Sequence, residues 1–259
     1  MLLNSTRTAG AGGAVRRAFE ELSAVIRLAH KYDIPQAEDE ALLYLRDYSF
    51  DPLFEVPSPT SPTAFKQLFG PLESAHHIAI VNLARLTNRP SFLPLALYHC
   101  TYLGSALFDG WTREDGTTEY LSDSDLRLCV DARAWLMQER ACFISTVFGA
   151  PSSGCERAGS CADMMRGAAS SLLSSAGLLR ADAMRDLRYI VDLLGCKSSE
   201  LCGPCMRELL ARNEAGRKDI FERLPEIFEI AVEGWPRWDG GHSTVAWGGA
   251  DAEESHALR

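Results

Sequence analysis

"LSDSDLRLCVDARAWLMQERACFISTVFG", residues 121–149, contains no proline, and its one glycine is the last residue, Gly149. Apolar residues recur through it at helical spacing, which predicts one long helix with a buried stripe. Ser122 or Asp123 can cap the start of this helix, and Gly149 can end it. The predicted buried stripe comprises Leu126, Cys129, Val130, Ala134, Leu136, Met137 and Phe143.

Helical patterns also occur on both sides of this stretch, and strands with alternating apolar residues are nearly absent. Pro35 is suited to the first turn of a helix that follows an earlier one. Further helices are expected at about 161–176, 180–195 and 203–229. The sequence therefore predicts an all-α fold, a helical array or bundle. In the first helix the apolar residues at three- and four-residue steps are Phe19, Leu22, Val25, Ile26 and Ala29.

Changes in composition divide the chain into six segments. Glycine, alanine, serine and threonine dominate its start, and a stretch with four prolines separates two helical regions. Such prolines interrupt regular structure. We expect a disordered start (1–15), a helix pair (16–48), a proline-rich linker (49–63), a helical extension (64–150), a cysteine-containing helical unit (151–235) and a disordered tail (236–259).

Charge and hydropathy exclude several classes of function. The 259 residues carry a net charge of −9, which disfavours nucleic-acid binding because phosphate contacts need clustered Lys and Arg. No apolar window is long enough to span a membrane, and the N-terminus lacks the apolar core of a signal peptide. We therefore expect an intracellular protein, in the cytoplasm or the nucleus, whose eight cysteines are reduced thiols or metal ligands.

Two pairs of closely spaced cysteines predict a metal site. Cys202 and Cys205 enclose Gly-Pro, and Cys155 and Cys161 are separated by five residues. Zinc takes four thiolate or imidazole ligands in a tetrahedron, and each pair supplies two. The intervening chain is long enough for two antiparallel helices that would bring the pairs together. Cys196 is an alternative ligand that could replace Cys155 or Cys161.

Two other uses of these thiols stay open. Cys-Gly-Pro-Cys is the redox motif of thioredoxins, which requires a preceding strand and a helix N-terminus. The preceding residues, among them Met184, Leu187 and Ile190, have a helical period instead. Alternatively, the cysteines are free thiols, some of them buried. The remaining Cys100, Cys129 and Cys142 fall in helical stripes, where core packing is expected.

No combination of residues in the chain points to catalysis. His76 and His77 are adjacent in a predicted helix, so their side chains point about 100° apart and cannot easily bind one metal together. His99 beside Cys100 has the same problem. Phosphate-binding glycine motifs, the His-Glu-x-x-His motif and a nucleophile elbow are absent. We therefore expect a protein that is not an enzyme.

The stretch Leu22–Leu45 resembles the C-terminal helix pair of BTB/POZ domains, through Leu28-Ala29-His30-Lys31-Tyr32. The rest is similar to the helical extension of a group of fungal BTB proteins, through "FLPLALYHC" (92–100), the cysteines of 202–205 and "RKDIFERLPEIFEI" (217–230). The family's α/β core would precede residue 16 and is missing here. The resemblance implies a protein–protein interaction module with protein partners, and an exposed helix face would favour self-association.

Overall fold

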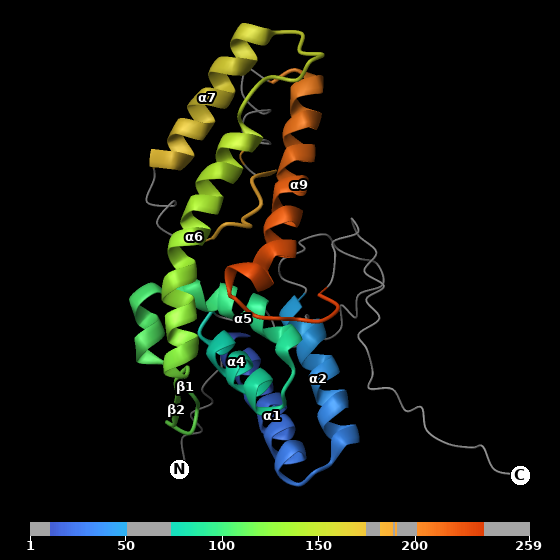
Figure 1. Ribbon diagram of the computed structural model, residues 1–259, viewed down its shortest axis with the longest axis vertical. Helices are drawn as coiled ribbons and strands as arrows, with labels where there is room; N and C mark the ends of the chain where they lie inside the picture. Colours follow the sequence, from blue (N-terminus) through green and yellow to red (C-terminus); the bar gives the residue numbers. More distant parts are fainter. Residues whose placement is uncertain (1–10, 51–73, 175–181, 189, 191–200, 236–259) are drawn as a thin grey trace, which may run out of the picture.

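The computed structural model describes residues 11–50, 74–174, 182–188, 190 and 201–235, and Figure 1 shows their arrangement. Helices account for most of these residues, and the two strands in this part of the chain are short. The predicted all-α class is therefore confirmed. None of the described helices has the length and apolar character needed to cross a membrane.

The first two helices form an antiparallel pair (Figure 1). Helix α1 spans Ala11–Lys31 and helix α2 spans Pro35–Phe50, with Pro35 in the first turn as predicted. The turn between them passes through Asp33, whose φ is 55°. Helix α1 begins at Ala11, so the prediction of disorder through residue 15 is wrong for residues 11–15.

Only part of the predicted inner stripe of α1 is buried. Phe19, Ile26 and Ala29 are buried, but Val25 is 47% exposed. On a helical wheel Val25 lies about 100° from Ile26, which places it beyond the core-facing arc. The residues of α2 that pack into the core are Ala41, Leu42 and Leu45.

Helices α4 (His76–Leu86) and α5 (Leu93–Cys100) form the centre of the molecule (Figure 1). Nearly all their residues are buried, because neighbouring elements cover them on most sides. Short 3-10 helices flank α5 at Pro90–Phe92 and Thr101–Asp109. Ser91 lies within the first of these, and Phe92 occupies the N-cap position of α5.

A small hairpin follows the second 3-10 helix. Strand β1 (Trp111–Thr112) pairs antiparallel with β2 (Thr118–Glu119). Its Glu119 carboxylate accepts hydrogen bonds from Arg27 at 2.7 and 2.8 Å and from Asn82 at 3.2 Å. Arg113 also donates to Glu119. This carboxylate therefore connects the hairpin to α1 and α4.

Helix α6 (Asp123–Val147) is the predicted long helix. The Ser122 hydroxyl accepts a hydrogen bond from the Asp125 backbone N–H at 3.1 Å, which confirms the predicted cap. Of the predicted stripe, Cys129, Leu136 and Phe143 are buried. Val130 and Ala134 are exposed, in contrast to the prediction.

Helices α7 (Ala158–Ser174) and α9 (Gly203–Ile227) complete the described helices. In Figure 1 the end of α6 and the starts of α7 and α9 meet at the upper end of the molecule. Helix α9 packs along α6, and the two helices come close at Gly216: a Cβ there would lie 2.6 Å from Cε2 of Phe143.

Residues 182–187 are not helical, so the prediction of a helix from residue 180 is wrong for this part. Side chains from α5 and α9 satisfy the backbone instead. Arg217 Nε donates to the Met184 carbonyl at 3.0 Å, and Met184 N–H donates to the Tyr98 hydroxyl at 2.8 Å. Leu187 N–H donates to the Asn213 side-chain oxygen at 2.9 Å. These partners replace the hydrogen bonds that a helix would supply.

Several predictions lie outside the described residues. They concern the disordered residues 1–10, the proline-rich linker beyond Phe50, the tail 236–259, the later part of the predicted helix at 180–195 and the alternative ligand Cys196.

Candidate metal centre

Two helix starts and one turn bring four cysteines together. Cys202 is the residue before α9, and Cys205 lies in the first turn of that helix. Pro204 suits this first turn because its missing N–H has no partner there in any helix. Cys161 lies in the first turn of α7, and Cys155 lies in the connection between α6 and α7. The two predicted pairs therefore meet.

The distances between the sulfur atoms suit one metal ion. All four Sγ atoms lie within 4.8 Å of one another, and those of Cys155 and Cys202 are 3.7 Å apart. A tetrahedral zinc site with Zn–S bonds of about 2.3 Å has S–S edges of about 3.8 Å. The distance of 3.7 Å between the sulfur atoms of Cys155 and Cys202 also far exceeds the S–S bond of about 2.05 Å in a disulfide. The four sulfur atoms are therefore close enough to share one ion, and the Cys155–Cys202 separation matches a tetrahedral edge.

The cluster is nearly enclosed by protein. Cys161 and Cys205 are 0% exposed and Cys202 is 3% exposed, whereas Cys155 is half-buried. The turn after α6 covers one side: Ser152 N–H donates to Cys205 Sγ at 3.4 Å. A Cβ on Gly154 would lie 3.8 Å from Cβ of Pro204, so the turn rests against the start of α9.

The electrostatic surroundings of the four thiols differ. The backbone N–H groups of Cys205 and Glu156 lower the pKa of the Cys202 thiol to about 6. Burial raises the pKa of Cys205 to about 12 and also raises that of Cys161. Close thiols oppose one another's ionisation, and a dication reverses that effect. Of the three thiols with shifted pKa values, Cys202 therefore ionises most readily.

The other described cysteines are distant from this chemistry. Cys100 and Cys129 are buried in α5 and α6, as expected for core packing. Cys142 is exposed, so the prediction that it packs in the core is wrong. Its neighbours along α6, Phe143 and Ile144, face the core in its place.

The adjacent histidines have roles in packing. His76 is buried and its ring lies 5.0 Å from Phe19 and 5.4 Å from Trp111. The ring of His77 stacks on that of His99 at 4.2 Å, and burial lowers the pKa of His99 to about 4. Among the described residues, the group of three or more potential metal ligands that the fold brings together is formed by the four cysteines.

The structure meets one of the two requirements of a thioredoxin-like site. Cys202 directly precedes the N-terminus of α9, where the helix dipole stabilises a thiolate. The described strands, β1 and β2, have two residues each and pair with each other. Within the described ranges no larger sheet supports Cys202. Cys202 Sγ instead lies within 4.8 Å of the sulfur atoms of Cys155, Cys161 and Cys205.

The sequence did not reveal the backbone groups that surround the cluster. The hydrogen bond from Ser152 to Cys205 was not predicted. The position of Glu156 N–H beside Cys202 was also missed. Turn chemistry predicts where a chain reverses, whereas the partners of its N–H groups depend on how distant helices pack. In comparisons with protein-family models, curated proteins and solved structures, nothing matches this chain.

Proposed function

We propose that Cys155, Cys161, Cys202 and Cys205 bind one zinc ion that stabilises a helical scaffold. The observation that carries this proposal is the mutual approach of four sulfur atoms to within 4.8 Å. Zinc is the metal of choice because four thiolates in a tetrahedron are its usual structural ligand set. The chemistry that the ion supplies is structural, since four protein ligands leave no position for a substrate.

A zinc ion here would join three segments that the chain separates. Cys155 follows α6, Cys161 starts α7, and Cys202 and Cys205 start α9. Metal–sulfur bonds would add to the apolar packing of these cysteines, which belong to the core together with Met165 and Leu209. Binding free energy of a structural metal is folding free energy.

Cobalt substitution tests this proposal, because Co²⁺ bound by four thiolates in a tetrahedron gives intense charge-transfer and visible absorption. We expect one equivalent of Co²⁺ to produce these bands and zinc to abolish them. The Cys205→Ser variant should lose the bands. The control Cys142→Ser makes the same exchange at an exposed position of α6 and should keep them. Bands typical of octahedral Co²⁺, or unchanged bands in Cys205→Ser, would contradict the proposal.

A second function, non-enzymatic protein–protein interaction, is favoured by exposed apolar side chains on the first helix pair. Val25, Leu28, Tyr32 and Ile34 are between 47% and 64% exposed. Large exposed apolar groups gathered on one element are typical of binding surfaces. The resemblance of this pair to BTB/POZ helices agrees with this function and stays a prediction.

A photocrosslinking residue at position 28 tests the second function. We expect it to give discrete protein adducts in cells, and the same residue at exposed position 167 of α7 to give none. Equal adduct patterns from both positions would contradict an interaction surface on α1.

A further inference from the structure

Helix α1 has a second apolar stripe that faces away from the core. Val25 is 47%, Leu28 53% and Tyr32 64% exposed. Their spacing of three and four residues places them on one side of the helix. Phe19 and Ile26 occupy the opposite, buried side. Helix α1 is therefore apolar on a face that the described part of the chain leaves open.

Two opposite charges lie at the ends of this stripe. Glu21 and Lys31 are exposed, and both lie within the arc of about 120° that also contains Val25, Leu28 and Tyr32. Each is five residues from Ile26, which corresponds to about 7.5 Å along the helix axis in either direction. The Lys31 Nζ lies 5.4 Å from the centre of the Tyr32 ring. The face thus runs from negative to positive across an apolar centre.

This arrangement is complementary to its own inverted copy. If two such helices meet antiparallel around a two-fold axis near Ile26, residue i faces approximately residue 52 − i of the other copy. Glu21 then meets Lys31 at both ends, and in the middle Leu28 of one chain meets Ala24 and Val25 of the other. Such a two-fold contact uses the same patch on both chains. A partner of single charge would be repelled at one end of the stripe.

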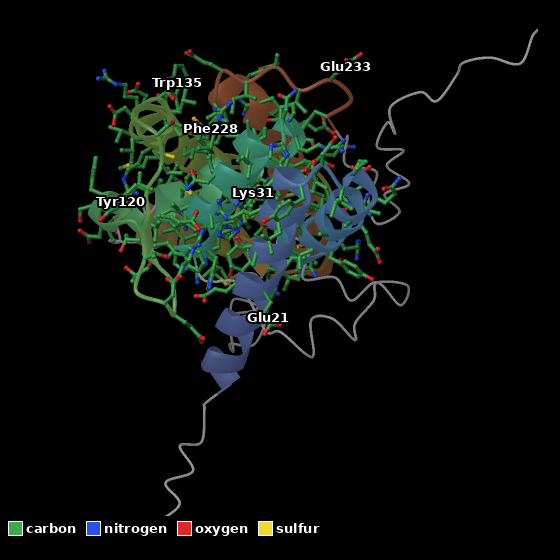
Figure 2. All side chains as sticks on the ribbon, turned by 90° about the horizontal axis from the view of Figure 1, so that it is seen from below. Glu21, Lys31, Tyr120, Trp135, Phe228 and Glu233 are labelled. Carbon is green, nitrogen blue, oxygen red and sulfur yellow. The ribbon has the colours of Figure 1, made fainter. Side chains whose placement is uncertain are left out.

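We propose that two copies of this chain bind through the α1 faces formed by Glu21, Val25, Leu28, Lys31 and Tyr32, antiparallel to each other. Figure 2 shows α1 on the near side of the molecule, with Glu21 and Lys31 labelled along it. The proposal deepens the protein-interaction function by naming its partner, and it is independent of the metal site.

The dimer should be reversible. One helix face per chain gives an interface at the low end of the area range of stable complexes, which begins at about 1,200 Å² in total. We therefore expect a concentration-dependent equilibrium between monomer and dimer, in which the charges at both ends set the orientation.

Charge reversal with sedimentation velocity tests the proposal. E21K gives a stripe with two positive charges, and K31E gives one with two negative charges. Each change replaces both attractive pairs by repulsive ones, so each variant alone should raise the dimer Kd by about tenfold or more. Mixing E21K with K31E should restore the dimer as a heterodimer, and the double variant should restore it in one chain.

The control is E233K, which makes the same charge change at an exposed site far from Glu21 in Figure 2; its Kd should match the unaltered chain. A chain that stays monomeric at all concentrations overturns the proposal, as does a dimer that E21K and K31E leave intact. Failure of the mixture to restore binding also overturns it. If the chain is monomeric but position 28 crosslinks to another protein, the dimer is wrong and the interaction function remains.

Discussion

The close approach of α6 and α9 at Gly216 predicts the effect of a single methyl group. In Gly216→Ala the new Cβ would lie 2.6 Å from Cε2 of Phe143, a ring that is 4% exposed and enclosed by the core. Replacing glycine by alanine in a helix normally stabilises by about 1 kcal/mol. Overpacking of a core costs about 1–3 kcal/mol. A new Cβ at 2.6 Å is closer than real Cβ atoms come, so this cost belongs to the upper part of that range, about 2–3 kcal/mol. After the gain of about 1 kcal/mol from replacing glycine, we expect a net destabilisation of about 1–2 kcal/mol.

The matched control is Gly167→Ala in α7, where a new Cβ has no neighbour within 4 Å. This variant should gain about 0.5–1 kcal/mol. Thermal-unfolding measurements should therefore show a Tm about 2–8 °C lower for Gly216→Ala and a higher Tm for Gly167→Ala. In a double-mutant cycle, Phe143→Leu should recover part of the loss by making room for the methyl group. A Gly216→Ala chain as stable as the unaltered one would refute the proposed packing of α6 against α9.

Three further predictions concern the polar contacts and the thiols. Glu119→Gln removes a charge that accepts hydrogen bonds from Arg27 and Arg113, so the free energy of unfolding, measured with denaturant, should fall by about 2 kcal/mol. A smaller fall than in the control Glu233→Gln would contradict this prediction. Zinc should be released as the pH falls, because its thiol ligands must be deprotonated and the pKa of Cys205 is about 12 without metal. A chelating dye measures the released zinc, and zinc retention that increases on acidification would contradict this prediction. Cys142 should react with a thiol reagent before the four clustered thiols do, and reaction of all five at the same rate in untreated protein would contradict the protection of the cluster.

Local signals in the sequence predicted the long helix and the four cysteines that the fold gathers. Ser122 and the uninterrupted apolar pattern fix α6 because capping and periodicity act within a few residues. The cysteine pairs were predicted from spacing, and the fold brings all four together. We predicted that two antiparallel helices connect the two cysteine pairs, but residues 182–187 of this connection are not helical.

The sequence could not predict which side of a helix its neighbours cover. Val130 and Val25 fit helical stripes but are exposed, because a stripe about 100° wide leaves uncertain which flanking residue the core includes. Cys142 was misplaced for the same reason. Residues 182–187 have a helical period, yet Arg217 and Asn213 bind their backbone groups from a distant helix. Such tertiary contacts override local propensity.

The most direct test of the metal centre is the zinc content of the chain purified without added metal, measured by mass spectrometry of the elements. The proposal predicts about one zinc per chain, its loss in Cys202→Ser and its retention in Cys142→Ser. A chain without zinc that also fails to bind added zinc would contradict it, and so would a Cys202→Ser chain that keeps its zinc.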